Sequence, residues 1–272
     1  MSIAVTLSIY ASLVAYILAG GEALRNLFGG ILLAPSWVYS IIFFAILAAI
    51  IYFDINLLTD SEISISSLLV MAVFILFIFA APHIDVQNYT GFELSNFFIP
   101  YGVVLFAFLG FVGIPEAGEI LGKDKKDLKK DIYLGIFIPL VLYVIFASSI
   151  IGLMGAGTQE LGTMGIENFL GVKGLVLGNL FLLFAISTSF LALGFGLKEY
   201  FFYDRKLSNT RSWLFVCLMP FILSFVVRFF ASFTQVLEVS AILFGGTQAI
   251  LMILVAMRAQ KLGKRKPEYT MP

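Results

Sequence analysis

The chain has few of the residues on which soluble enzymes depend. Only 12% of its 272 residues are charged, and it contains a single cysteine, Cys217, and a single histidine, His83. A lone cysteine excludes an intramolecular disulfide, and a lone histidine excludes a histidine-based metal cluster. There is no HExxH, GxSxG or P-loop motif and no Ser/His/Asp set. The sequence therefore predicts no enzyme, no cofactor and no metal site.

Apolar residues are what the chain has in excess, at 60% of the total. Soluble domains hold about 45–50% apolar residues, and a soluble protein of this length could not bury so many. The apolar residues form eight spans, each near or above the ~20 residues that cross a bilayer as a helix. We therefore predict an all-α, polytopic membrane protein. Its spans are Ile3–Phe28, Ser36–Phe53, Ile63–Ala81, Phe97–Leu121, Asp131–Met154, Lys173–Tyr203, Ser212–Phe230 and Gln235–Leu262.

The distribution of charge predicts the orientation in the bilayer. Most of the 17 basic residues lie in three segments, 123–130, 198–211 and 258–266. If every span crosses once, these segments share one side, and an excess of Lys and Arg marks the cytoplasmic side. We therefore predict that the first span runs outward and that the tail, residues 263–272, is cytoplasmic. In this context the C-terminal basic cluster flanks the lipid bilayer and does not indicate a nucleic-acid partner.

The fourth span, Phe97–Leu121, is interrupted in its middle by Gly110, Gly113 and Pro115. Gly and Pro free backbone groups from the helical ladder, and in hydrocarbon such groups must be satisfied by protein, water or a solute. Secondary transporters bind their substrates at broken helices of this kind. The alternative interpretation is a Gly-Pro kink that packs against a neighbouring helix and binds no substrate.

The residues around this break predict the class of substrate. The amino ends of half-helices suit a carboxylate and the carboxyl ends suit a cation, and an amino acid offers both groups one carbon apart. Phe106, Phe108 and Phe111 are placed to form an apolar wall for its side chain. We therefore predict that these three residues bind the substrate together with the bare backbone at Gly110 and Gly113.

Hydroxyl groups on two other spans are further candidates. Ser187, Thr188 and Ser189 lie midway along the sixth span. Their hydroxyls either bond back to their own helix or form an oxygen cluster for a coupling cation or for a polar group of the substrate. Tyr16 of the first span is a candidate hydrogen-bonding partner of the substrate, and the alternative is an ordinary aromatic residue with a satisfied hydroxyl.

Carboxylates within the spans complete the candidate set. A carboxylate at mid-bilayer costs roughly 3 kcal/mol on insertion scales, so each one needs a reason. Glu116, next to the break, is predicted to take up the coupled proton or to cap freed amides. Glu119 is closer to the lysines and is predicted to pair with them. Glu22, near the outer end of the first span, is predicted to pair with Arg25.

The sequence resembles the amino acid/polyamine/organocation superfamily, and within it the aromatic amino acid transporters and the amino acid/auxin permeases. The resemblance rests on Leu13–Leu24 (LVAYILAGGEAL), Phe97–Glu119 (FFIPYGVVLFAFLGFVGIPEAGE) and Ala185–Tyr200 (AISTSFLALGFGLKEY), with Arg265–Tyr269 (RKPEY) at the end. It covers essentially the whole chain, and the order and spacing of the segments agree.

The resemblance implies the inverted-repeat fold of the bacterial leucine transporter. In that fold two five-helix halves are related by a pseudo-two-fold axis in the membrane plane, and the first helix of each half is broken. Here it implies one transmembrane domain, with residues 1–81 as the remainder of the first repeat and residues 97–262 as the second. The fourth span would be the broken sixth helix, and Ser187–Ser189 would lie where sodium-coupled relatives bind their cation.

Relatives of this kind begin with two further helices, and most continue into an eleventh. We therefore expect either a fragment of a longer permease or a reduced protein whose missing helices come from a second subunit. The leading hypothesis is a proton- or sodium-coupled secondary transporter of amino acids in the cell membrane, with alternating access around Phe106–Pro115. The alternative is a membrane subunit or scaffold that transports nothing and whose Gly/Pro break is a packing kink.

Overall fold

In the computed structural model, the described residues are 2–53, 62–91, 94, 97–98, 100–108, 110, 114, 128–163 and 165–262. Every regular element in these ranges is helical, which confirms the predicted fold class. Six of the helices are long and apolar enough to cross a membrane, and a shorter apolar helix, α2, accompanies them.

Most of the helices follow the predicted spans closely, and α4 covers only part of the fourth span. They are α1 (Ser2–Phe28), α2 (Ser36–Tyr52), α3 (Glu62–Ala80), α4 (Tyr101–Ala107), α6 (Leu128–Met154), α7 (Glu167–Glu199), α8 (Asn209–Val227), α9 (Phe233–Ser240) and α10 (Gly246–Leu262). A π-helical turn, Tyr200–Asp204, extends α7, and another, Ala241–Gly245, joins α9 to α10. The last predicted span is therefore continuous but not regularly α-helical.

Local sequence explains where several helices begin. Ser232 caps α9 in a capping box with Gln235, in which each side chain bonds the backbone N–H of the other residue. Ser208 caps α8 through the N–H of Arg211. The chain kinks at Gly171, whose φ of 62° is open to glycine and strained for other residues. The kink lies two residues before Lys173, where the predicted sixth span begins.

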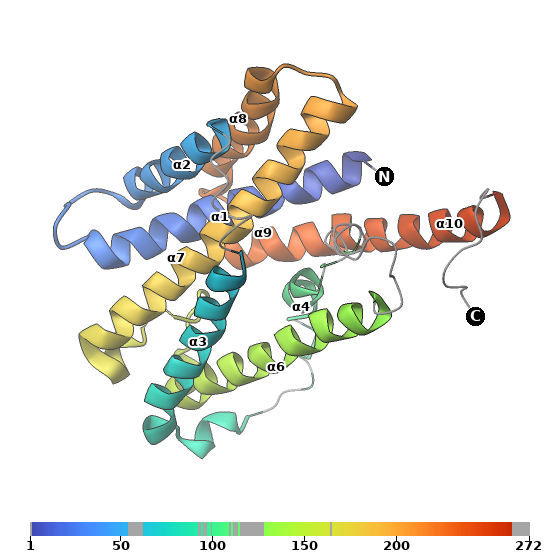
Figure 1. The fold of residues 1–272 in the computed structure, drawn as a ribbon. Helices are drawn as coiled ribbons and strands as arrows, with labels where there is room; N and C mark the ends of the chain where they lie inside the picture. Colours follow the sequence, from blue (N-terminus) through green and yellow to red (C-terminus); the bar gives the residue numbers. More distant parts are fainter. Residues whose placement is uncertain are drawn as a thin grey trace.

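Helix α1 is the central element of the fold (Figure 1). It contacts α2, α7, α8 and α9, while α3 and α6 pair with each other and α3 also contacts α7. Leu13 and Ile17 of α1 are fully buried, in one cluster with Phe43 of α2, Phe190 of α7 and Val216 of α8. The core of the protein therefore surrounds the middle of α1.

Bare glycine backbone brings α1 and α2 close together. A Cβ added at Gly20 would lie 2.5 Å from the ring of Phe43, and one added at Gly21 would lie 2.9 Å from the Cα of Ser40. Small residues at helix contacts are the usual means of close packing in membranes, where lipid supplies no hydrophobic drive between helices. The pair Gly20-Gly21 thus fixes the distance between the two helices.

The outward surfaces of the helices are apolar. Ile78 of α3, Phe137 of α6 and Ile253 of α10 are 66%, 61% and 53% exposed, respectively. Water would penalise such surfaces, whereas hydrocarbon does not, and the backbone groups of each helix are satisfied within the helix. These surfaces agree with a protein that lies within a bilayer.

Candidate functional site

The fourth predicted span stops being an α-helix in its middle. Helix α4 ends at Ala107, and the next residue, Phe108, has φ −100° and ψ 6°. Gly110 lies in a 3₁₀ conformation. The predicted site residues Phe111, Gly113 and Glu116, like Pro115 and Glu119, lie outside the described residues.

A cavity of about 370 Å³, here called the central cavity, lies where α4 ends. Four of the predicted site residues line it, from three different elements: Tyr16 of α1, Phe106 of α4, Gly110 beyond α4, and Ser189 of α7. These residues are far apart in the sequence and were selected for different chemical reasons. The structure brings them to one place.

Three of the residues that line the central cavity, Tyr16, Tyr143 and Ser189, carry hydroxyl groups that interact. The hydroxyls of Tyr16 and Ser189 are within hydrogen-bonding reach of each other, and Tyr143 of α6 is close enough to Tyr16 to interact with it electrostatically. The Tyr143 hydroxyl donates to the carbonyl oxygen of Ala107 over 3.3 Å. This cluster therefore links α1, α6 and α7 to the last residue of α4.

The polarity of the central cavity comes from hydroxyls, one amide and backbone. Among its described lining residues none carries a formal charge. Ala107, at the carboxyl end of α4, lines the cavity, and the carboxyl end of a helix carries partial negative charge. A cationic group such as an ammonium ion fits this end, while Phe106 and Leu193 offer apolar contact. The arrangement can therefore bind a small molecule that combines an ammonium group with an apolar body.

The other predicted residues are arranged differently. Thr188 and Ser187 do not line the central cavity, and the Thr188 hydroxyl donates to the carbonyls of Phe184 and Ala185 in its own helix. Of the three neighbouring hydroxyls, only Ser189 reaches the cavity. Phe108 is 38% exposed and makes an edge contact with Tyr143, with ring centroids 5.8 Å apart. It touches the hydroxyl cluster from outside the cavity.

Sequence reasoning missed four polar residues of the site: Ser8, Ser12, Tyr143 and Gln248. Ser8 and Ser12 precede Tyr16 at intervals of four residues, so the three lie on one face of α1. This four-residue spacing of hydroxyl residues could have been recognised in the sequence. Gln248 is 2% exposed, and its amide donates to the carbonyl of Ala4 over 3.2 Å. A buried amide in an apolar span was also a signal.

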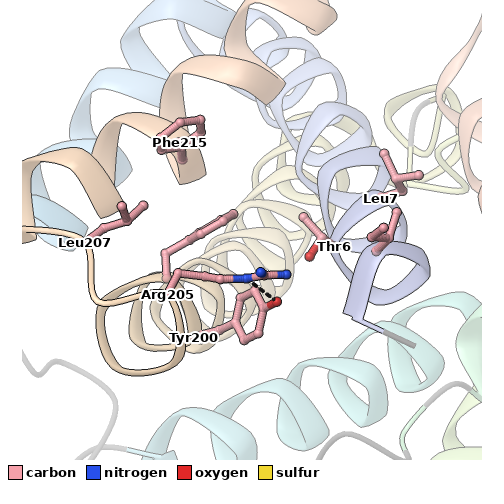
Figure 2. A pocket seen from close by; sticks show the side chains of 8 residues that line it. Thr6, Leu7, Tyr200, Arg205, Leu207 and Phe215 are labelled. Atoms are coloured by element: carbon pink, nitrogen blue, oxygen red, sulfur yellow. Dashed lines mark hydrogen bonds between the residues drawn. The ribbon is translucent and has the colours of Figure 1, made fainter.

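A larger cavity, of about 460 Å³, lies at the predicted cytoplasmic end of the bundle. We call it the Arg205 cavity (Figure 2). The Nε of Arg205 donates to the Tyr200 hydroxyl over 2.9 Å, and the guanidinium lies over the Tyr200 ring. Figure 2 shows Arg205 extended toward Thr6 of α1. The lining is otherwise mainly apolar, and none of the predicted site residues that the structure describes takes part. The volume of a cavity alone therefore does not identify the substrate site.

Residues 1–272 match the model of the tryptophan/tyrosine permease family, and the chain therefore belongs to that family. No curated protein matches the chain. The match covers the whole chain and confirms the predicted amino acid permease. Family membership implies an amino acid substrate, a membrane location and a transporter rather than an enzyme.

Proposed function

We propose that this permease is a secondary active transporter that binds an aromatic amino acid in the central cavity. The observation that carries the proposal is the end of α4. There Ala107 and Gly110 lie in one cavity wall with Tyr16 and Ser189, on elements that the sequence separates widely. The family description supports tryptophan or tyrosine as the substrate class.

In this proposal the substrate ammonium binds at the carboxyl end of α4. Partial negative charge at that end favours a cation, and the hydroxyls of Tyr16 and Ser189 are oriented by the same cluster. The aromatic side chain packs against Phe106. The substrate carboxylate is assigned to free amides between Phe111 and Gly113, a prediction from the sequence that lies outside the described residues.

Transport follows from alternating access around the interrupted span Phe106–Pro115. A proton or a sodium ion drives it, with Glu116 as the proposed proton carrier and the Ser189 hydroxyl as a proposed ligand for sodium. The protein is placed in the cell membrane with its C-terminus in the cytoplasm, as the positive-inside rule favours.

The test is uptake into proteoliposomes with a panel of radiolabelled amino acids under separate proton and sodium gradients. We expect tryptophan or tyrosine to accumulate under one of the two gradients only. Gly110→Leu should abolish uptake and leave insertion intact, because a Cβ at Gly110 meets nothing within 4 Å and the longer side chain would fill the cavity. Gly135→Leu, on the open side of α6, is the matched control.

Two results would contradict the proposal. Normal uptake by Gly110→Leu would remove the central cavity from the path. Absence of uptake for every amino acid tested would favour a membrane subunit that transports nothing. If Glu116 carries the proton, Glu116→Gln should change the pH dependence of uptake, and an unchanged profile would exclude it.

A further inference from the structure

Another cavity of about 370 Å³ lies toward the C-terminal end of α1, the end that the charge pattern predicts to be external. We call it the Arg228 cavity. Its walls come from α1, α2, the α6–α7 connection and the segment around the start of α9. The central cavity is lined by α1 residues as far as Tyr16, and the Arg228 cavity begins at Leu18. The two cavities therefore follow one another along a single helix.

Arg228 supplies the positive charge of this cavity. It is partly buried, and one terminal nitrogen donates to the Ser36 hydroxyl over 3.2 Å. Within the described parts of the chain, no carboxylate oxygen lies within 4.0 Å of its guanidinium. A guanidinium presents five N–H donors in a planar fork that matches a carboxylate. Arg228 thus retains donors and charge for an anionic ligand group.

Glu22 supplies negative charge in the same cavity. Its partner Arg25 is 3.9 Å away, and both side chains are substantially exposed, so this predicted ion pair exists but is weak. The Glu22 carboxylate can therefore accept hydrogen bonds from a ligand ammonium group. Glu160 also lines the cavity, but its Oε1 accepts a hydrogen bond from the N–H of Thr234 over 2.5 Å. This hydrogen bond ties the Glu160 carboxylate to the first turn of α9.

Apolar side chains form the rest of the wall. Leu18, Leu161 and Phe233 line the cavity together with the three charged residues Glu22, Glu160 and Arg228. A ligand that matches this lining has a carboxylate, an ammonium group and an apolar or aromatic body. A free amino acid zwitterion has these three parts, and a simple anion, a simple cation or a hydrocarbon has only one of them.

We propose that the Arg228 cavity is a second binding site, at which an aromatic amino acid binds on the predicted external side before it reaches the central cavity. Arg228 binds the carboxylate and Glu22 the ammonium group, and Phe233 contacts the ring. This inference rests on the proposed function for the identity of the ligand. Its site, however, shares none of its lining residues with the central cavity.

The test uses a cysteine at Ala231, which lines the Arg228 cavity. The native Cys217 is fully buried and should not react with a polar reagent. Intact cells that express Ala231→Cys are labelled with a membrane-impermeant thiol reagent, with and without L-tryptophan. We expect tryptophan to slow labelling. Tryptamine lacks the carboxylate and indole-3-propionate lacks the ammonium group, so neither should protect at the concentration at which tryptophan does.

Three further substitutions, each combined with Ala231→Cys, show which cavity the protecting tryptophan occupies. Adding Arg228→Gln should raise the tryptophan concentration for half-protection by about tenfold or more, the loss expected for a charge-assisted hydrogen bond. Lys173→Gln, which removes an exposed positive charge elsewhere on the predicted external side, should leave the tryptophan concentration for half-protection unchanged. Gly110→Leu, which fills the central cavity, should also leave it unchanged.

The outcomes separate this inference from the proposed function. Protection that survives Gly110→Leu and is lost with Arg228→Gln supports the second site, whether or not the protein transports tryptophan. Protection that is lost with Gly110→Leu and kept with Arg228→Gln shows that the signal comes from the central cavity, and it overturns the second site. Tryptophan uptake without any protection of Cys at position 231 also overturns it and leaves the proposed function standing.

Discussion

The ammonium group of Lys198 donates a hydrogen bond to the carbonyl oxygen of Ile51 over 2.7 Å, and the lysine is only 4% exposed. The bond joins α7 to the last turn of α2, where carbonyls lack helical partners and a cation is favoured.

Lys198→Met should therefore destabilise the protein. The substitution preserves the length of the side chain but leaves the Ile51 carbonyl without this donor, at a cost of about 1–3 kcal/mol in the free energy of unfolding. Thermal unfolding in detergent should show a lower melting temperature. The control is Lys173→Met, at an exposed lysine near the other end of α7. Equal melting temperatures for the two variants would show that the Lys198 bond contributes nothing.

Tyr143→Phe should weaken substrate binding without unfolding the protein. The Tyr143 hydroxyl anchors the end of α4 at Ala107, and its loss removes one neutral hydrogen bond, worth about 0.5–1.5 kcal/mol. We expect the KM for uptake to rise by about two- to tenfold. Tyr133→Phe, at a 64% exposed tyrosine of the same helix, serves as the control. An unchanged KM for Tyr143→Phe would remove this hydroxyl from the site.

Gly21→Ala should force α1 and α2 apart. The new Cβ would lie 2.9 Å from the Cα of Ser40, which is backbone and cannot move alone. Overpacking of this kind costs about 1–3 kcal/mol. Gly196→Ala, in α7, meets nothing within 4 Å and should be neutral in the same thermal unfolding assay. A neutral Gly21→Ala would mean that the helices are not held at this distance.

Glu160 should make stability depend on pH on the predicted external side. Partial burial raises the pKa of its carboxyl, but hydrogen bonds from Ser232 and Thr234 outweigh this and hold the pKa below its ordinary value. A depressed pKa contributes stability above the unfolded-state value, and that stability is lost as pH falls through the folded-state value. The melting temperature of Glu160→Gln should therefore lie below that of the wild type at pH 7, and the gap should close below about pH 4. A gap that is constant with pH would contradict this prediction.

The span positions were predictable because apolar length is a strong constraint in a bilayer. The observed α1, Ser2–Phe28, and α2, Ser36–Tyr52, match the predicted spans to within a residue at each end. The π-helical turns Tyr200–Asp204 and Ala241–Gly245 were not predictable. An inserted residue in a helix depends on tertiary packing, and it leaves the hydrophobic pattern almost unchanged.

Some of the residues that the sequence predicted for the site lie together in the structure. Gly110 was predicted because glycine and proline free backbone groups from a helix, and Tyr16 and Ser189 were predicted because they carry hydroxyls within apolar spans. All three residues line the central cavity. Ser187 and Thr188, which the prediction grouped with Ser189, do not line this cavity, because successive residues of a helix point about 100° apart. Tyr143 could not be chosen over the other tyrosines without knowing which helix packs beside α4.

Helix α1 passes both the central cavity and the Arg228 cavity as one uninterrupted rod, from Ser2 to Phe28. Ile17, which is fully buried in the core, lies between the two. If α1 tilts about this packed middle, its two ends move in opposite directions. A displacement of the helix at one cavity is then accompanied by a displacement at the other, without any change in the length or hydrogen bonding of α1.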